Sequence, residues 1–343
     1  MLIKLYQDED EPSWNGYVNE SSSSECYHQV GWKDVIERSF GHKTFYLMAE
    51  SREGKVNGLL PLVHIKSVLF GNYMASMPYF NYGGVCADDE ETRNQLLGEA
   101  VRIASKEGAE HLELRHTVNL EGELQVKTSK VSMHLSLPST SEELWKSLSS
   151  KLRSQVKRPE KEKMYVQIGR EDELGSFYNV FCQNMRDLGT PVYPVRFFRN
   201  ILDRFPQSTW IASVYKDSKP VASGFLVGFK NRMEIPWASA LREFNRISVN
   251  MLLYWEVLKY SIEQGYEQFD FGRSTPGEGT YRFKKQWGAK PHQLYWNYWL
   301  KNGGPLPEGN PHNPKNKLAI TLWRKLPLSV TKMIGPLIAK NLP

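Results

Sequence analysis

A short pattern occurs twice in this chain, beginning at Gly108 and again at Gly265, about half of the chain length further on. The two copies read GAEHLEL and GYEQFDF, so they share the glycine, a glutamate two residues later and an acid between two apolar residues. Apolar residues at helical spacing precede each copy, over 90–106 and 248–264. Both glycines then stand where a helix C-terminal cap is expected. The sequence therefore predicts a duplicated unit.

The residues upstream of the two copies follow a common order of predicted elements. A strand pair around a polar turn is followed by a third strand in each half, at 44–49, 58–65 and 74–79, and at 209–215, 221–229 and 233–240. Each half therefore reads helix, antiparallel strands, helix and strand. This order predicts a mixed α/β fold of the α+β type, used twice.

Composition limits the class of protein. With 40% apolar and 12% aromatic residues, the chain can bury real cores. Cys26, Cys86 and Cys182 lie far apart and show neither a disulfide framework nor metal-ligand spacing. The first residues turn acidic before any apolar run develops, and no window approaches the roughly 18 apolar residues of a membrane span. We therefore expect a cytoplasmic protein with no metal site and no tightly bound cofactor.

The two halves are separated by a Ser- and Pro-rich stretch at 137–150. Thr140 and Glu143 have the spacing of a capping box, so a helix is expected to begin there. The predicted division of the chain is an N-terminal domain, 1–138, a C-terminal domain, 139–300, and a basic amphipathic tail, 301–343.

The stretch from Phe269 to Pro291 carries the strongest functional signal. A strand-like FDF leads into a glycine-containing loop, and then into a segment where Arg282, Lys284 and Lys285 alternate with aromatic residues. Glycines let the backbone approach a ligand closely, and lysines beside such a loop can neutralise an anion. The alternative is a surface hairpin with solvated lysines.

A second cluster, SMPYFNYGGV at 76–85, places Tyr79, Asn81 and Tyr82 beside a Gly-Gly pair at a strand end. Aromatic groups and permissive backbone at a strand terminus suit a concave ligand site. The alternative is a tight turn that is packed by its own tyrosines.

Two more candidate regions lie in the second half. Arg153 and Lys157 are four residues apart on a basic helix and share a face that could bind phosphate, although a solvated helix explains them too. Arg186 and Tyr193 flank a Gly- and Pro-punctuated loop between helices, where ligand-binding residues often sit.

The 269–291 stretch resembles the closing motif of the FemAB/FemX aminoacyltransferases, in which a strand and a glycine loop precede an aromatic–lysine step, here Phe283 and Lys284. The basic helix and the 185–198 loop also resemble segments of that superfamily. The 76–85 segment resembles a FemAB-related group associated with exosortase/PEP-CTERM exopolysaccharide systems. The resemblance covers nearly the whole chain. It implies two tandem GNAT-like (acyl-CoA N-acyltransferase-like) domains in a bacterial protein of cell-envelope biogenesis.

The resemblance implies transfer of an aminoacyl or acyl group from an activated donor to an amine of a peptidoglycan or exopolysaccharide precursor. Such a reaction needs oxyanion stabilisation, for which Lys284 is the candidate. Asp270 would orient the loop or act on the proton, with a structural loop anchor as the alternative. We expect Lys284 to lie in a polar loop, where its truncation changes stability by no more than about 0.5 kcal/mol. The candidate substrate-binding residues are Tyr79, Asn81, Tyr82, Arg153, Lys157, Arg186, Tyr193, Arg273 and Phe283.

The segment 241–250, LREFNRISVN, bears on the identity of the acyl donor, because it contains no glycine. Acetyl-CoA-dependent GNAT enzymes normally hold pyrophosphate on the backbone amides of a glycine-containing turn before the main helix. This absence favours aminoacyl-tRNA over acyl-CoA as co-substrate, and the net charge of +6 suits an anionic partner. Two alternatives remain, an acyl-CoA-dependent N-acetyltransferase and a non-catalytic GNAT-like protein of polysaccharide export.

In the tail, lysines alternate with apolar residues in two short helical stretches broken by Pro327 and Pro336. A basic amphipathic helix can lie on an anionic membrane, so peripheral contact with the inner membrane is one expectation. The preferred expectation is that the tail folds back on the N-terminal domain.

Overall fold

The computed structural model describes residues 1–67, 70–120, 122, 124–307 and 314–342. The chain forms two compact units, each assembled from separate stretches of sequence. The first unit comprises Met1–Val131, His292–Glu308 and Lys340–Pro343, and the second comprises Ser132–Pro291 and Gly309–Ala339.

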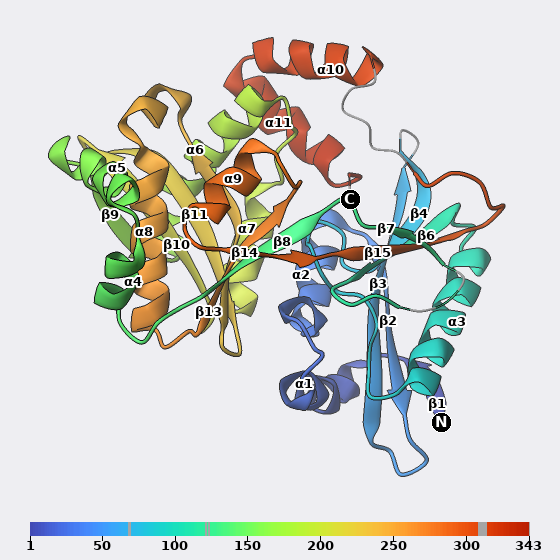
Figure 1. The fold of residues 1–343 in the computed structure, drawn as a ribbon. Coiled ribbons are helices and arrows are strands. Elements are labelled where there is room, and N and C mark those ends of the chain that lie inside the picture. The colour runs from blue at the N-terminus through green and yellow to red at the C-terminus, as the bar shows by residue number, and fades with distance from the viewer. Residues whose placement is uncertain (68–69, 121, 123, 308–313, 343) are drawn as a thin grey trace. The chain divides into compact units, whose positions relative to one another are not determined.

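The first unit is built on a mixed sheet with strand order β1-β2-β3-β4-β6-β15-β7, and β5 pairs with β3 (Figure 1). Its strands are β1 (Leu2–Leu5), β2 (Lys43–Glu50), β3 (Val56–Ser67), β4 (Gly71–Ala75), β5 (Cys86–Ala87), β6 (His111–His116), β7 (Gln125–Lys127) and β15 (Tyr295–Leu300). Its helices are η1 (Asp8–Asp10), α1 (Glu11–Glu20), η2 (Cys26–His28), α2 (Gly31–Phe40) and α3 (Glu90–Lys106).

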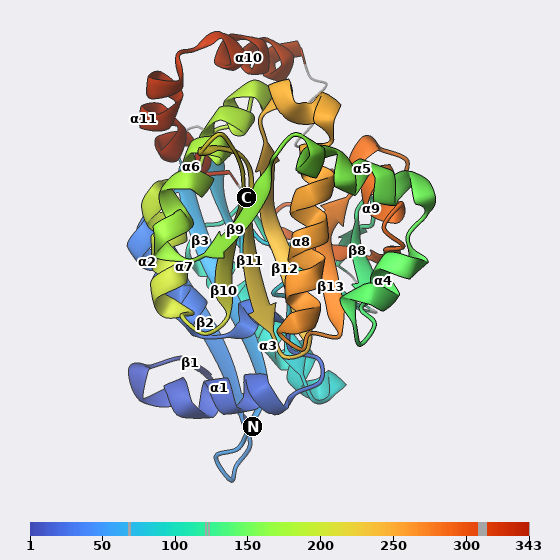
Figure 2. The same cartoon turned by 90° about the vertical axis from the view of Figure 1, so that its left-hand side faces the viewer.

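The second unit contains a sheet with strand order β14-β8-β13-β12-β11-β10-β9 (Figure 2). Its strands are β8 (Val131–Ser136), β9 (Tyr165–Gly169), β10 (Thr209–Lys216), β11 (Lys219–Phe229), β12 (Arg232–Ala240), β13 (Gln268–Ser274) and β14 (Lys290–Gln293). Its helices are α4 (Ser141–Ser147), α5 (Ser150–Lys161), α6 (Glu171–Leu188), α7 (Val195–Arg204), η3 (Arg242–Ile247), α8 (Val249–Glu263), α9 (Gly279–Lys285), α10 (Pro314–Lys325) and α11 (Leu328–Ala339).

The two sheets repeat one arrangement, as the duplicated pattern predicts. β6 runs parallel to β4, and β13 runs parallel to β12, so GAEHLEL and GYEQFDF end in equivalent strands. Glu113 of β6 is in register with Ala75, and Asp270 of β13 is in register with Glu234. Gly108 and Gly265 have φ angles of 72° and 81° at the ends of α3 and α8, where a left-handed residue terminates a helix.

Each sheet also takes its next strand from the other half of the sequence. β15 pairs with β6 in the first sheet, whereas β8 lies beside β13 in the second. The predicted boundaries at 138 and 300 therefore differ from the compact units, because β8 precedes the first boundary and β15 precedes the second. Neither exchange has a local signal in the sequence, because strand pairing joins residues far apart along the chain.

Helices cover both faces of the second sheet, and neighbouring residues of its central strands contact them on opposite sides. An ideal Cβ on Gly224 would lie within van der Waals distance of Leu253 in α8, whereas Phe225 packs against Phe177 in α6 and Phe198 in α7. Consecutive residues of a strand point to opposite faces, so α8 covers one face while α6 and α7 cover the other. Figure 2 shows α8 running along the strands.

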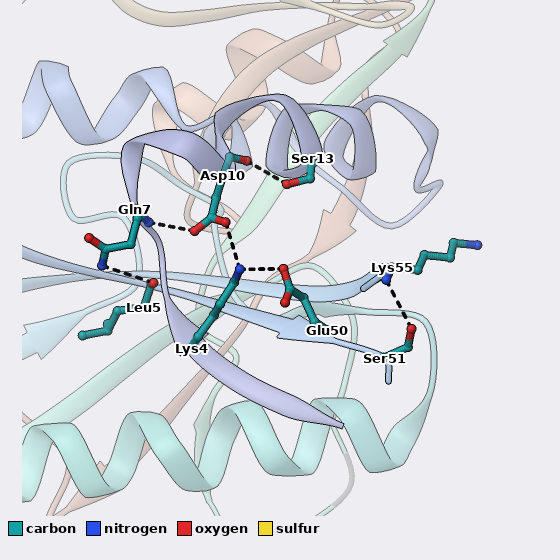
Figure 3. Close-up of polar contacts among 8 residues, drawn as sticks. All are labelled: Lys4, Leu5, Gln7, Asp10, Ser13, Glu50, Ser51 and Lys55. Atoms are coloured by element: carbon teal, nitrogen blue, oxygen red, sulfur yellow. Dashed lines mark hydrogen bonds and ion pairs between the residues drawn. The ribbon is translucent and has the colours of Figure 1, made fainter. Parts of the chain in front are cut away.

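The start of the first unit is fixed by a half-buried lysine that bridges two carboxylates. Lys4 Nζ lies 2.9 Å from Asp10 Oδ1 and 2.7 Å from Glu50 Oε1, while the Gln7 backbone N–H donates to Asp10 Oδ2 (Figure 3). The hydrogen bonds that Lys4 donates to Glu50 and Asp10 raise the pKa of Lys4. These contacts tie β1 and η1 to β2 at the sheet edge.

The tail is divided between the two units. α10 and α11 belong to the second unit, where both contact α6, whereas Lys340 belongs to the first unit, where its carbonyl oxygen accepts a hydrogen bond from the Tyr79 hydroxyl. Pro327 separates the two helices as predicted, but Pro336 lies inside α11. No helix in the described part of the chain is long and apolar enough to cross a membrane.

Candidate active site

β12 and β13 separate partway along their length. Their register joins Arg232, Met233 and Glu234 to the first residues of β13, after which β12 continues to Ala240. A register shift between β11 and β12 leaves two residues of β12, including Pro236, opposite one residue of β11. Such a bulge bends a strand, and proline has no N–H to donate to a neighbour. The two parallel strands therefore diverge into a wedge.

The wedge holds a cavity of about 380 Å³ that is lined by residues of the second unit. Its lining comes from the end of α6, the end of β12, η3, the start of α8 and α9. The lining residues are Asn184, Leu188, Ala238, Ser239, Ala240, Arg242, Asn245, Asn250, Tyr254, Gly279, Thr280, Phe283 and Lys284.

Lys284 is the buried cationic group of this cavity. Lys284 is 7% exposed, and its Nζ donates to the carbonyl oxygens of Gly272 and Arg273, each at 2.9 Å. Burial lowers the pKa of Lys284 to about 8, although the charges of Asp270 and Glu234 act in the opposite direction. A buried lysine with a perturbed pKa at a cavity wall is a marker of functional sites.

The position of Lys284 corrects the expectation of a polar loop. Residues 279–285 form α9, which Phe283 and Trp287 hold in place through ring contacts with Tyr254 at 5.0 and 6.5 Å between centroids. Lys284 therefore lies on a packed helix, and its truncation removes buried atoms. The expected stability change of about 0.5 kcal/mol at most applies to surface residues and does not fit this site.

Asp270 binds neighbouring groups near the end of β13. It is fully buried, and its Oδ1 accepts hydrogen bonds from Ser132 Oγ and from the Gly272 backbone N–H, both at 2.7 Å. His134 Nε2 lies 3.3 Å from Oδ2. Asp270 is not among the residues that line the cavity. Its contacts are those of a loop anchor, and it reaches Lys284 through its charge and through Gly272.

The start of α8 forms the remaining wall. Ser248 adopts a left-handed conformation with φ of 62° directly before α8, where the pyrophosphate-binding turn of GNAT enzymes normally carries glycine. Asn250 and Tyr254, one helical turn apart on α8, both line the cavity. Arg242 Nη2 donates to the Asp187 carbonyl oxygen at 2.5 Å, so this guanidinium already has a protein acceptor.

The equivalent wedge of the first unit is filled by its own side chains. Arg115 occupies the position that Gly272 occupies in β13, and its Nε donates to Glu113 Oε1 at 2.7 Å. The Tyr298 hydroxyl donates to Glu113 Oε2 at 2.6 Å, and the Arg115 guanidinium lies 4.4 Å from the Trp296 ring centroid. Gly272 instead has φ of 76°, which favours glycine, and presents its carbonyl to Lys284.

The 76–85 cluster packs around Arg115 in the first unit. Its backbone bridges the ends of β4 and β6, and Arg115 donates to the carbonyl of Phe80. Tyr82 is 2% exposed, and Tyr79 donates its hydroxyl to the Lys340 carbonyl at 2.5 Å. Asn81 is half-buried beside them. All three candidates lie in the first unit, and none lines the cavity of the second.

The basic candidates of the second unit mostly contact the protein itself. Arg153 caps α4 by donating to the carbonyls of Trp145, Lys146 and Leu148, and Lys157 Nζ lies 5.5 Å from the Trp145 ring centroid. Neither of these two side chains lines the cavity.

The remaining candidate residues of the second unit differ in whether they line the cavity. Arg186 forms an ion pair with Asp187 at 2.8 Å, and the Tyr193 ring packs against Phe197. Arg273 is exposed and gives its backbone carbonyl to Lys284. Of the eleven residues singled out from the sequence, Phe283 and Lys284 line the cavity.

Sequence reasoning missed the polar residues that converge on Lys284. Asn184 Nδ2 donates to Ser239 Oγ at 3.1 Å, joining α6 to β12 at the cavity wall. Asn245 and Asn250, which line the cavity, both lie within the glycine-free stretch 241–250. The available signal was the i, i+4 pair of Asn250 and Tyr254 within the otherwise apolar stretch 249–255 at the start of α8. The described residues contain no cluster of three or more His, Cys, Asp or Glu side chains arranged to hold a metal.

Comparison with known proteins agrees with this architecture. Residues 146–285 match the family model described as an acetyltransferase (GNAT) domain. No curated protein sequence matches the chain. The chain is similar to the structure of FemX, with 14% identity, 86% of this chain and 97% of that chain covered, and a TM-score of 0.66.

Two further solved structures share the fold. A tandem GNAT protein from the clavulanic acid biosynthesis pathway has 10% identity, covers 89% of this chain and 100% of its own, and has a TM-score of 0.53. The L-PGS protein from Bacillus licheniformis has 12% identity, coverage of 86% and 96%, and a TM-score of 0.51. The chain is therefore made of two tandem GNAT-like domains of mixed α/β type, and its second unit carries the GNAT domain that the sequence matches.

Proposed function

We propose that the second unit is an N-acyltransferase site, which moves an aminoacyl or acyl group from an activated donor to an amine of a cell-envelope precursor. The observation that carries this proposal is Lys284, a buried amine on the wall of the wedge cavity. The GNAT match of residues 146–285 and the fold shared with FemX support the reaction class. The resemblance of 76–85 to exopolysaccharide-associated proteins supports an envelope acceptor, either peptidoglycan or exopolysaccharide.

The proposed chemistry follows from the N–H groups of the Lys284 ammonium. An ammonium group has three N–H donors, and two of them are used by the carbonyls of Gly272 and Arg273. The third can meet the oxyanion that develops when an amine attacks the carbonyl carbon of the donor. The new C–N bond forms, the bond to the leaving oxygen or sulfur breaks, and the amine proton passes to the leaving group or to solvent. Lys284 acts in this step as a fixed cation.

The cavity also limits how the reactants are held. Tyr254 and Phe283 provide an aromatic wall, and Asn250 and Ser239 provide polar groups on neighbouring walls. Holding a donor carbonyl beside Lys284 would convert a bimolecular encounter into a positioned reaction. A cavity of about 380 Å³ fits the reacting ends of the two substrates, with the larger parts of each left outside.

Two donors fit this site. Aminoacyl-tRNA is favoured by the lack of glycine in 241–250, where a CoA pyrophosphate would need backbone amides. An acyl-CoA donor is favoured by the GNAT match itself. The two are distinguished by the leaving group, because a CoA donor releases a thiol and an aminoacyl-tRNA releases a ribose hydroxyl.

The experiment presents the purified chain with charged tRNA or acyl-CoA, together with an amine-bearing envelope precursor fraction. The acyl product is followed by mass spectrometry, and thiol release is followed in parallel. Product formation that depends on Lys284 supports the proposal. Unchanged product formation by Lys284→Ala, or no product with either donor, argues against it and favours a binding protein.

A further inference from the structure

α11 has its small residues inside and its large apolar residues outside. Thr331, Gly335 and Ala339 are buried at four-residue spacing, whereas Met333 and Leu337 are 70% and 64% exposed. At 100° per residue these two sets lie on opposite sides of the helix. A helix folded for water alone buries its large apolar side chains and exposes its small or polar ones. The outer face of α11 is therefore suited to an apolar surrounding.

The inner face of α11 is fixed by contacts within the second unit. An ideal Cβ on Gly335 would lie 3.0 Å from Val192, so glycine allows the helix to approach closely. Lys332 Nζ donates to Asn179 Oδ1 at 2.9 Å on α6. These contacts set the rotation of the helix, and the exposure of Met333 and Leu337 follows from that rotation.

α10 also exposes large apolar residues, although its inner side buries a tryptophan. Trp323 is buried, while Leu318 and Leu322, four residues apart, are 63% and 56% exposed. Lys325 is exposed at the next position of the same stripe. Arg324 Nη2 donates to the Leu188 carbonyl at 3.1 Å, which fixes the opposite side of α10 against the end of α6. Exposed leucines and a lysine thus share one outer face.

The charge of this region has one sign. From Gly309 to Pro343 the sequence contains no aspartate or glutamate, and its cations are Lys315, Lys317, Arg324, Lys325, Lys332 and Lys340. Lysine side chains beside exposed leucine and methionine can keep their amines at lipid phosphates while their stems lie along apolar groups. An anionic surface with an apolar interior matches both features, whereas a protein partner would need only one of them.

We propose that the outer faces of α10 and α11 bind the surface of an anionic phospholipid bilayer. Leu318, Leu322, Met333 and Leu337 would enter the boundary between head groups and acyl chains, and the exposed Lys317 and Lys325 would contact the lipid phosphates. α10 and α11 would lie on the membrane surface, since no helix of the described residues is long and apolar enough to cross a membrane. This inference does not depend on the acyl-transfer chemistry proposed above.

The test is flotation of the full-length protein with vesicles of phosphatidylcholine alone and with vesicles containing about 30% phosphatidylglycerol. We expect at least about tenfold stronger partitioning onto the anionic vesicles at low salt, with loss of binding as salt screens the charges. Met333→Gln with Leu337→Gln, and separately Leu318→Gln with Leu322→Gln, should each weaken partitioning about tenfold. Leu2→Gln is the matched control, because Leu2 is 58% exposed in the first unit.

The replaced side chains are exposed, so the variants should melt at the wild-type temperature, which is checked first. Wild-type protein that does not float with anionic vesicles overturns the proposal. Equal flotation of the wild type and both double variants overturns it as well. If the α11 variant instead converts a dimer into a monomer in sedimentation equilibrium, without vesicle binding by the wild type, the face belongs to a second copy of the chain.

Discussion

Lys284 Nζ lies 2.9 Å from the carbonyl oxygen of Gly272, and this contact joins α9 to the end of β13. The equivalent strand position in the first sheet carries Arg115, whose side chain fills the wedge together with Glu113. One duplicated position thus holds a glycine that gives its carbonyl to Lys284 in the second unit and an arginine that pairs with Glu113 in the first.

The buried amine of Lys284 should make stability depend on pH in a defined window. Its pKa is about 8 in the folded chain and about 10.5 when exposed, so between these values the unfolded chain binds more protons. Stability from this residue therefore rises as pH increases from 8 to 10.5. Relative to Lys284→Met, the wild-type unfolding free energy should rise by at most about 3 kcal/mol. Urea unfolding at several pH values measures it, and a constant difference would refute the shifted pKa.

Asp270 should tune the same amine. Its charge raises the pKa of Lys284, so Asp270→Asn should move that pKa further below 8. The variant also weakens the anchor on Ser132 and Gly272, which predicts a loss of roughly 1–3 kcal/mol in stability. Competitive acetylation of lysines, read by mass spectrometry against pH, follows Lys284 directly. An unchanged Lys284 titration in a folded variant would show that the two groups are not coupled.

Glu113 is expected to support folding of the first unit. Burial raises its pKa, but Arg115 and the Tyr298 hydroxyl outweigh burial, so the pKa lies below its usual value. Glu113→Ala leaves Arg115 charged and buried, which should cost about 3–5 kcal/mol. The control is Glu99→Gln, which breaks an exposed pair with Arg102 and should cost less than about 1 kcal/mol. Equal costs in chemical denaturation would mean that the filled wedge does not stabilise the unit.

Acetyl-CoA should bind weakly. The residue before α8 is Ser248, and 241–250 contains no glycine. The segment therefore lacks the glycine-containing turn whose backbone amides normally bind the CoA pyrophosphate. We predict a dissociation constant weaker than about 100 μM. Calorimetry with acetyl-CoA tests this, and micromolar affinity would promote the acyl-CoA donor over aminoacyl-tRNA.

Local patterns predicted the elements of the fold well. The helix expected at 90–106 coincides with α3, and the one expected at 248–264 matches α8 within one residue at each end. Thr140 accepts a hydrogen bond from the Glu143 backbone N–H at the start of α4, as its spacing indicates. These features depend on neighbours in the sequence, which is why the sequence alone is sufficient for them.

Features set by distant contacts were not predictable in the same way. The exchange of β8 and β15 between the sheets depends on pairings between opposite ends of the chain. The docking of the tail on α6 was missed because α11 buries Thr331 and Gly335 and exposes Met333, the reverse of the usual hydrophobic pattern. Lys284 was assigned to a loop because a seven-residue helix rich in charge has little periodicity.

The most direct test of the central claim is acyl transfer by Lys284→Ala beside Lys285→Ala. Lys285 is the matched control, because it is exposed one residue further on and does not line the wedge cavity. Loss of a preorganised oxyanion donor should slow transfer by about 10²–10³ in Lys284→Ala, while Lys285→Ala keeps nearly the wild-type rate. Equal loss in both folded variants, or no loss in either, would contradict a catalytic role for Lys284.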